Sequence, residues 1–459
     1  MRRKPILALL MATSLVVGSP VANANETPGS PPQAQQAFDN KIIKRINVDN
    51  IYDDIAHLSS EPRVAGTEAE WNAVQYIDDK YSSFGYDTEI QPFTFESYQT
   101  PEVSVNVAGE PLSSNSFTYT PNGEVSGEVV YAGLATEDDL AGIELGGKIA
   151  LIKRGDISFA DKVLNAAQAG ASAVMIYNNT SGSLSGTLGA PNEAFVPAVS
   201  LSQTDGDRLA TLLAEGQTIE ATVNVTGGGI SQKTSHNVVA VKEATNKKKD
   251  TNQIIVVGAH HDSVPGSPGA NDDASGVAAS IELARVMANM PTDTELRFVS
   301  FGAEELGLLG SYHYVETLSQ DERDRIVGMF QMDMVGSRDA GELVMFTVDG
   351  EKNAVTDLSA AAGVRTGNPL GYGQEGRSDH VPFYYAGIPA ALFIHSPTEP
   401  WYHTPEDSLD KISKEKLQET AEIVGAAVYQ VARPDTPALE RAKVSPKPVD
   451  YERIVGGLQ

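Results

Sequence analysis

The chain has 459 residues, with 34 Lys and Arg against 61 Asp and Glu, a net charge of -27, eight histidines and no cysteine. Such an acidic surface repels phosphate backbones and anionic lipid, so we expect no nucleic-acid partner and no stable membrane association. Without cysteine, the chain has no disulfide, no thiolate metal site and no cysteine nucleophile. Any metal ligand is therefore His, Asp or Glu. At about 100–200 residues per domain, the length suggests two or three domains.

The first 24 residues are typical of a secretory signal. Residues 2–4 are basic, residues 6–18 form a mostly apolar run, and residues 22–24 read Ala-Asn-Ala. The apolar run is shorter than the roughly 20 residues that span a bilayer, although a short membrane anchor is the alternative interpretation. We expect cleavage near Ala24 and a secreted, extracellular bacterial protein, whose charge becomes 31 − 61 = -30.

The segment after the signal begins with a polar, proline-rich stretch, so residues 25–40 are predicted to be a disordered leader. Apolar residues at helical spacing then predict a helix over residues 47–59 and a second over 68–84, which Gly85 would terminate. Residues 86–95 alternate between apolar and polar, as in a strand.

The composition of the sequence changes near residue 105. Residues 106–229 are rich in Gly, Ala and short β-type runs, and contain no histidine. Strands are predicted at 127–133, 148–155 and 171–177, and a helix at 159–170. We expect this module to interrupt a single α/β domain made of residues 41–105 and 230–433.

Strands and helices alternate after residue 230, which indicates a mainly parallel sheet between helices. The predicted strands cover 254–260, 295–302, 328–336, 342–348 and 390–395, and the predicted helices cover 274–290 and 417–431. Residues 434–459 are predicted to be a tail.

Polar residues cluster where these strands end. His260 and Asp262 lie at the end of one strand, Glu304 and Glu305 follow another, and Asp333 lies near the end of a third. His403 follows the last strand within ten residues. Because ligands of open α/β sheets bind beyond the carboxyl ends of the strands, we expect these side chains to form one site.

A pair of metal ions in a hydrolytic site needs two imidazoles, three carboxylates, one of which bridges, and a further carboxylate as general base. The chain supplies this set. The predicted ligands are His260, Asp272, Glu305, Asp333 and His403, with Asp272 as the bridge. Glu304 is the predicted base, and Asp262 would accept the second ring N–H of His260.

Several motifs resemble those of the M28 family of di-zinc aminopeptidases, in the same order along the chain. The matching segments are 62–67 (PRVAGT), 258–263 (GAHHDS), 271–276 (NDDASG), 302–311 (GAEELGLLGS), 333–337 (DMVGS), 376–383 (GRSDHVPF) and 402–407 (YHTPED). The resemblance covers about residues 48–105 and 232–432. It departs from the family at His261, where an apolar residue is common, and this side chain is expected at the pocket rim or the surface.

The resemblance implies a three-layer zinc-exopeptidase fold holding two Zn²⁺ per chain. His260 and Asp333 would hold one ion, Glu305 and His403 the other, and Asp272 both. Glu304 would be the general base and acid. Tyr402 would stabilise the oxyanion, and Arg377 would contact substrate. Met334 directly follows a predicted ligand, so we expect it to line an apolar pocket for the first side chain of the substrate. The substrates would be the N-termini of peptides or proteins, and we expect a monomer.

The interrupting module resembles a protease-associated (PA) domain, a β-rich α+β unit often inserted in exported peptidases. The resemblance rests on residues 148–155 (KIALIKRG), 169–179 (AGASAVMIYNN) and 196–201 (VPAVSL). This pairing is consistent with the M28 resemblance of the remainder.

Other interpretations remain open from the sequence. Acidic pairs such as Glu304 and Glu305 often lie at a solvated helix start, and Asp272 and Asp273 could cap a helix. Carboxypeptidases and glutaminyl cyclases share the same fold, although a carboxypeptidase needs a cationic cleft and only Arg377 lies near the motifs. A binding protein with an inactive metal site is a third possibility, against which the intact ligand set argues. His261, His313 and His395 are predicted to have no role in catalysis, and Asp379 and His380 to be structural or to support the metal ligands.

Overall fold

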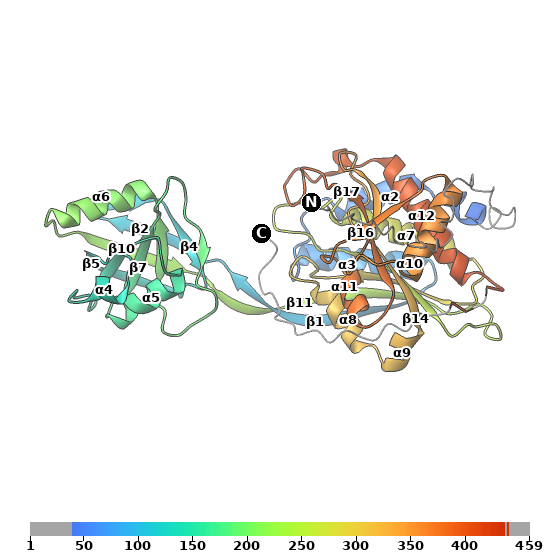
Figure 1. Ribbon diagram of the computed structural model, residues 1–459, viewed down its shortest axis with the longest axis horizontal. Coiled ribbons are helices and arrows are strands. Elements are labelled where there is room, and N and C mark those ends of the chain that lie inside the picture. The colour runs from blue at the N-terminus through green and yellow to red at the C-terminus, as the bar shows by residue number, and fades with distance from the viewer. Residues whose placement is uncertain (1–38, 437, 440–459) are drawn as a thin grey trace, which may run out of the picture.

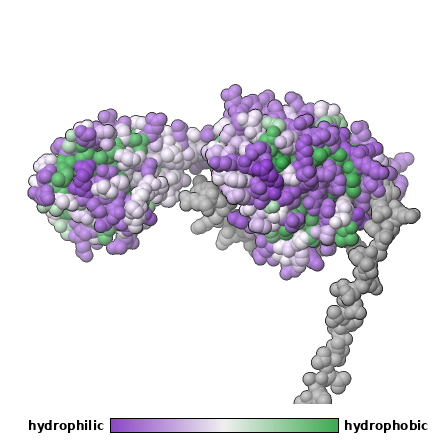
Figure 2. Space-filling view, turned by 90° about the horizontal axis from the view of Figure 1, so that it is seen from above, coloured by the Kyte–Doolittle hydropathy of each residue, from purple (hydrophilic) through white to green (hydrophobic). Residues whose placement is uncertain are grey.

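The computed structural model describes residues 39–436 and 438–439, in two bodies joined by a narrow connection (Figures 1 and 2). The predicted signal and nearly all of the predicted leader and tail lie outside the described residues. Asp39 and Asn40, expected in the leader, are helical. A contact with a distant segment accounts for this, because Asp39 is buried and its carboxylate accepts a hydrogen bond from Arg365 Nε at 2.6 Å. No helix in the described part of the chain is long and apolar enough to cross a membrane.

The larger body is built on an eight-stranded mixed sheet. Its strands, in spatial order, are β1 (Asp87–Gln99), β11 (Gly229–Lys242), β13 (Glu295–Phe301), β12 (Ile254–His260), β14 (Ile326–Met332), β17 (Ala390–Ser396), β15 (Glu342–Thr347) and β16 (Gly371–Gln374). The four central strands, β13, β12, β14 and β17, are parallel, as predicted. Strands β12, β13 and β14 are buried along their whole length, which requires helices on both faces.

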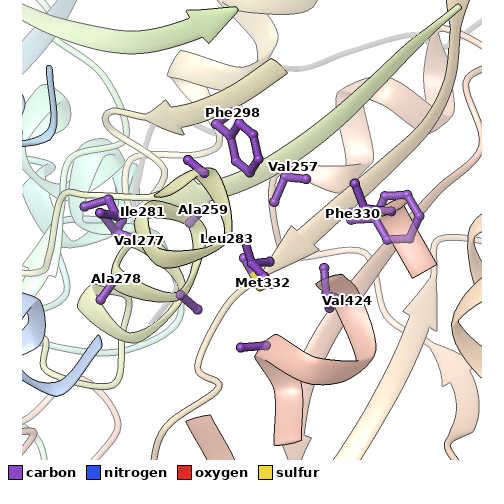
Figure 3. Close-up of a cluster of buried hydrophobic side chains, with 14 of the residues drawn as sticks. Val257, Ala259, Val277, Ala278, Ile281, Leu283, Phe298, Phe330, Met332 and Val424 are labelled. Atoms are coloured by element: carbon purple, nitrogen blue, oxygen red, sulfur yellow. The ribbon is translucent and has the colours of Figure 1, made fainter. Parts of the chain in front are cut away.

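Helices cover the two faces of this sheet. One face packs against α2 (Val48–Leu58), α3 (Glu68–Ser83), α7 (Ala274–Ala288), α10 (Ala354–Thr366) and α12 (Lys414–Ala432), and the other against α8 (Leu309–Thr317) and α11 (His380–Tyr385). Alternate residues of β12 serve the two faces, since Val257 packs towards α7 and Val256 towards α8. Figure 3 shows the first of these cores, where Val257, Phe330 and Met332 lie against α7 and α12. Two short elements, α9 (Gln320–Arg325) and a 3₁₀ turn (Leu409–Lys411), complete the three-layer α/β body.

The smaller body contains a nine-stranded sheet. Its strands, in spatial order, are β3 (Glu110–Leu112), β2 (Glu102–Val107), β10 (Glu220–Thr226), β5 (Gly123–Tyr131), β6 (Ile149–Lys153), β7 (Ala173–Tyr177), β9 (Ala198–Leu201), β4 (Ser114–Thr118) and β8 (Gly186–Thr187). Helices α5 (Phe159–Gln168) and α6 (Gln203–Ala214) cover opposite faces, so alternate residues of β6 and β7 point to each. The four-residue α4 (Glu137–Leu140) precedes β6.

The connection between the bodies is a two-stranded ribbon. Strands β1 and β11 pair without a break from Asp87 opposite Val241 to Gln99 opposite Gly229. The pairing of β11 with β13 ends at Val238 and Ser300, so the first part of β11 continues past the carboxyl end of β13. The smaller body therefore extends from the edge of the sheet where the predicted site lies (Figure 1).

Candidate metal centre

The polar residues predicted from the strand ends come together at one edge of the large sheet. His260 is the last residue of β12, and Asp333 directly follows β14. Glu304 and Glu305 lie in the loop after β13, Asp272 precedes α7, and His403 lies in the turns after β17. Four connections that follow strands of the sheet thus contribute to a single site.

Asp272 lies between the two histidines. Its Oδ1 is 3.2 Å from Nε2 of His260, and its Oδ2 is 3.2 Å from Nε2 of His403. On the first side, Nε2 of His260 is 3.6 Å from Asp333 Oδ1 and 4.0 Å from Glu304 Oε2. On the second side, Nε2 of His403 is 3.0 Å from Glu305 Oε2. Two groups result, each with the separations expected of ligands around one ion.

Several donor atoms of the two groups are buried and lack a hydrogen-bond partner in the protein. These atoms include Asp272 Oδ2, Glu305 Oε1, Asp333 Oδ1 and His403 Nε2. Buried polar atoms are normally hydrogen-bonded, so unpaired atoms that converge on the same points indicate a ligand. Imidazole nitrogens and carboxylate oxygens in this number suit zinc, and the excess of carboxylates favours cations between them.

The two neighbouring aspartates, Asp272 and Asp273, have different roles. Asp272 faces the histidines, whereas Asp273 points into the protein and is fully buried. Its carboxylate caps α7 by accepting from Gly276 N, and also accepts from the backbone N–H groups of His260 and Met334. Capping therefore applies to Asp273 alone, and the same side chain ties the ends of β12 and β14 together.

Comparison with known proteins agrees with this geometry. The family model described as Peptidase family M28 matches residues 237–428, which contain all six residues of the site. Over 445 residues, 94% of each chain, the sequence is 37% identical to "Aminopeptidase YwaD" of Bacillus subtilis (strain 168). The chain belongs to the M28 family of aminopeptidases. The resemblance of its motifs to that family is confirmed.

Further matches cover the rest of this M28 aminopeptidase. The PA domain model matches residues 125–209, within the smaller body, which confirms the second resemblance. Among solved structures, "Aminopeptidase from Aneurinibacillus sp. strain AM-1" is 57% identical, with a TM-score of 0.67 over 90% of this chain and 99% of that one. BSAP, a zinc aminopeptidase from Bacillus subtilis, is 37% identical, with a TM-score of 0.63 over 87% and 98%.

The electrostatics of the M28 site follow from crowded, buried acids. Burial raises the pKa of Glu305 to about 7, with a contribution from Asp272 and a smaller opposing one from His403. Burial also raises the pKa of Glu304 well above its usual value; His260 opposes this, and the charges of Asp379 and Glu305 add to it. Carboxyl groups with raised pKa values are suited to accept and return protons near neutral pH.

The pKa values of the two histidines are also raised, although burial opposes the shift. Burial alone would lower the pKa of His403, but its contacts with Asp272 and Glu305 raise the pKa to about 10. The pKa of His260 is likewise raised, since nearby carboxylates outweigh its burial. Each histidine therefore lies in a strongly negative environment, which favours the binding of a cation beside the imidazole ring.

Tyr402 lies at the rim of the site. Its ring stacks on that of His403, with 3.7 Å between centroids, and 38% of the residue is exposed. Burial and the neighbouring charges of Asp272 and Glu305 raise the pKa of its hydroxyl. The hydroxyl therefore remains protonated and can donate a hydrogen bond, as its predicted role requires.

The two predicted substrate contacts are less directly supported. The Arg377 side chain is 63% exposed, and its guanidinium forms two hydrogen bonds with Glu375, at 2.8 and 2.6 Å. Met334 is buried, and packs with Leu392 and Ile394. Contact of either residue with substrate stays a prediction.

Asp262 and His261 differ from expectation. Asp262 Oδ1 lies 3.6 Å from His260 Nδ1, beyond hydrogen-bond distance, because the carboxylate accepts the backbone N–H groups of Glu304 and Glu305 instead. Asp262 thus holds the loop of the predicted base. The expectation that His261 lies at the rim or the surface is wrong: it is fully buried, with Nδ1 3.0 Å from Ser300 Oγ.

One supporting residue was not expected to reach the site. Arg63, almost fully buried, donates to the carbonyl oxygens of His261, Leu58, Pro268 and Gly269 at 2.7–2.9 Å. It thereby holds the loop between β12 and Asp272. Its only sequence signal is its position in the segment 62–67.

Proposed function

We propose that this M28 aminopeptidase is secreted and removes the N-terminal residue of peptides, using two zinc ions and Glu304 as general base. The observation that carries the proposal is the position of Asp272, whose two oxygens each lie 3.2 Å from a different histidine. That arrangement favours a bridging carboxylate and hence two ions. The printed title of the BSAP structure, a zinc aminopeptidase, supports the choice of metal.

His260 and Asp333 would hold one ion, Glu305 and His403 the other, and Asp272 both. When bound, such ions lower the pKa of water and polarise a carbonyl group. Glu304 would take a proton from the attacking water and deliver it to the amine that leaves. The Tyr402 hydroxyl would donate to the oxyanion. The carboxylates of the site favour a cationic α-amino group, which suits an exopeptidase.

The carboxypeptidase alternative has weaker support. A substrate carboxylate needs an available cation, but the guanidinium of Arg377 is engaged by Glu375. Export rests on the signal-like segment 1–24 and on a composition without cysteine. Two zinc ions, peptide N-termini as substrates and a monomeric chain together form the proposal.

The variant Glu304→Gln tests the mechanism. The amide keeps the size of the side chain but does not act as a base, so kcat should fall by about 10²–10⁴-fold, with zinc content unchanged. Hydrolysis of aminoacyl p-nitroanilides and elemental analysis measure the two quantities. Glu406→Gln, an exposed change in the loop of His403, is the matched control.

Two results would contradict the proposal. Full hydrolysis by Glu304→Gln would remove the general base from the mechanism. Cleavage of an N-acetylated peptide as fast as the free peptide would point to a carboxypeptidase or an endopeptidase.

A further inference from the structure

A buried acid outside the ligand set lies directly behind the bridging residue. Asp407 is 1% exposed and follows His403 by four residues. Its Oδ1 accepts the backbone N–H of Asn271 at 2.8 Å, and its Oδ2 accepts that of Asp272 at 3.1 Å. Its own carbonyl accepts from Ala270 at 3.3 Å. The chain around Asp272 is therefore bound to the segment that carries His403.

A second tie links the same two segments. The Asn271 side chain donates from Nδ2 to Glu399 Oε1 at 2.7 Å, and its Oδ1 accepts the backbone N–H of Gly336 at 2.8 Å. Glu399 lies four residues before His403 and is also buried. Asp407 and Glu399 thus fix the loop on both sides of His403 to the chain at Asp272.

We call the hydrogen bonds that Asp407 and Glu399 accept from residues 271 and 272 the clamp. The two metal positions depend on it to different degrees. His260 and Asp333 lie at the ends of central strands, and Asp273 joins those ends without any contribution from the loop. His403 lies outside any helix or strand, its side chain is 22% exposed, and its φ of 59° is in the left-handed region. The hydrogen bonds of Asp407 and Glu399 therefore fix its place opposite Asp272, while Trp401 Nε1 ties the same loop to Asp339 Oδ2 at 2.9 Å.

We propose that Asp407 is a positioning residue that holds His403 against Asp272, and so makes the metal position of Glu305 and His403 separately sensitive to this one carboxylate. The inference rests on the two-metal site of the proposed function. An asparagine at 407 keeps one acceptor oxygen but turns an amide N–H₂ towards a backbone N–H. Residues that orient metal ligands typically contribute about 10–100-fold to metal affinity.

The test is a zinc titration of the full chain against a competing chelator. The wild type should bind two equivalents of zinc. Asp407→Asn should bind the first with unchanged affinity and the second about 10–100-fold more weakly. Its kcat should recover as free zinc is raised, with little change in KM. Glu406→Gln, which removes the same charge one residue earlier from an exposed side chain, should match the wild type.

A second pair of variants covers the case in which Asp407→Asn does not fold. Glu399→Ala, which cuts the tie from Asn271, should also weaken the second equivalent. Glu399→Gln keeps an acceptor oxygen and should restore most of that affinity.

The outcomes separate the two proposals. If the variants bound both equivalents of zinc as tightly as the wild type, or if both affinities fell by the same factor, the role of Asp407 would be overturned. The two-metal site would remain intact in either case. A wild type that binds a single equivalent would overturn the two-metal proposal, and with it the clamp.

Discussion

Both sheets of the molecule have parallel strands at their centre, yet their strand ends differ. In the large sheet, the carboxyl ends of β12, β13 and β14 carry buried acids and histidines whose atoms lack partners. In the PA insert, Arg154 follows β6 and bonds Asn178 at 3.1 Å, and Ser202 after β9 caps α6. Within residues 102–226, all described, Asn224 Oδ1 alone is a buried side-chain atom without a partner.

This difference shows that topology alone does not make a site. A parallel sheet offers an edge where loops and helix N-termini converge, and both sheets have one. Among the described residues, it is at the edge of the large sheet that buried histidine nitrogens and carboxylate oxygens without hydrogen-bond partners converge. Unsatisfied, converging side chains are therefore the better guide to chemistry than the fold.

The largest expected effect comes from the bridging residue. Asp272→Asn should lower kcat/KM by about a thousandfold or more, because the ions contribute several kcal/mol and each 1.36 kcal/mol is tenfold in rate. Asp161→Asn, the same change on α5 of the insert, should stay within about twofold. Kinetics with aminoacyl anilides and zinc analysis would measure both variants. An Asp272→Asn enzyme with wild-type activity would show that the strand ends of the two sheets do not differ in function.

A buried and an exposed arginine sharpen the comparison through stability. Arg63→Met leaves four carbonyl oxygens without their donor. The free energy of unfolding of the large body should therefore fall by about 3–5 kcal/mol. Arg154→Met, at an exposed strand end of the insert, should lower the free energy of unfolding of the insert by at most about 1 kcal/mol. Urea titration would measure each, and equal losses would show that burial does not separate the two sites.

A smaller effect is expected on acidification. Burial, together with the charge of nearby Lys416 and against a smaller opposing effect of the hydrogen bond with the Gly341 carbonyl, lowers the pKa of His395 to about 4. As the pH falls from 6.5 towards 4, the unfolded chain takes up a proton that the native chain refuses, so native stability falls. His395→Gln should remove about 1–3 kcal/mol of this loss between pH 7 and 4.

The insert contains no histidine, so its unfolding should lack this component. Urea titrations of the wild type and His395→Gln at several pH values would measure the effect. If the free energy of unfolding fell equally with pH in the two proteins, His395 would titrate normally in the native state.

The sequence predicted the strand ends well because apolar runs and the polar residues that follow them are local signals. It also pointed to the histidines and carboxylates that lie together around Asp272, since side-chain type and order along the chain are visible in the sequence. Helix α10 was not expected, although Asn353 caps it and Gly367 ends it. Neither was β16, whose short run of Gly371–Gln374 carries no apolar pattern and is specified by pairing with β15.

Contacts between distant segments account for the remaining differences. Arg63 binds carbonyl groups up to about 200 residues away, and no local feature marks an arginine as buried. His261 is buried because it faces Ser300 on β13, the neighbouring strand. The partners of Asp262 depend on where the loop of Glu304 and Glu305 folds back, which one-dimensional spacing does not specify.

The ribbon of β1 and β11 has a consequence for the origin of the molecule. Gln99 and Gly229 are opposite partners, so the chain leaves and re-enters the catalytic body at neighbouring points. A two-residue turn would join these positions without shifting the register of either strand. The 129 residues between them occupy the place of a hairpin loop, and could be gained, lost or exchanged as a unit while the catalytic sheet kept every strand.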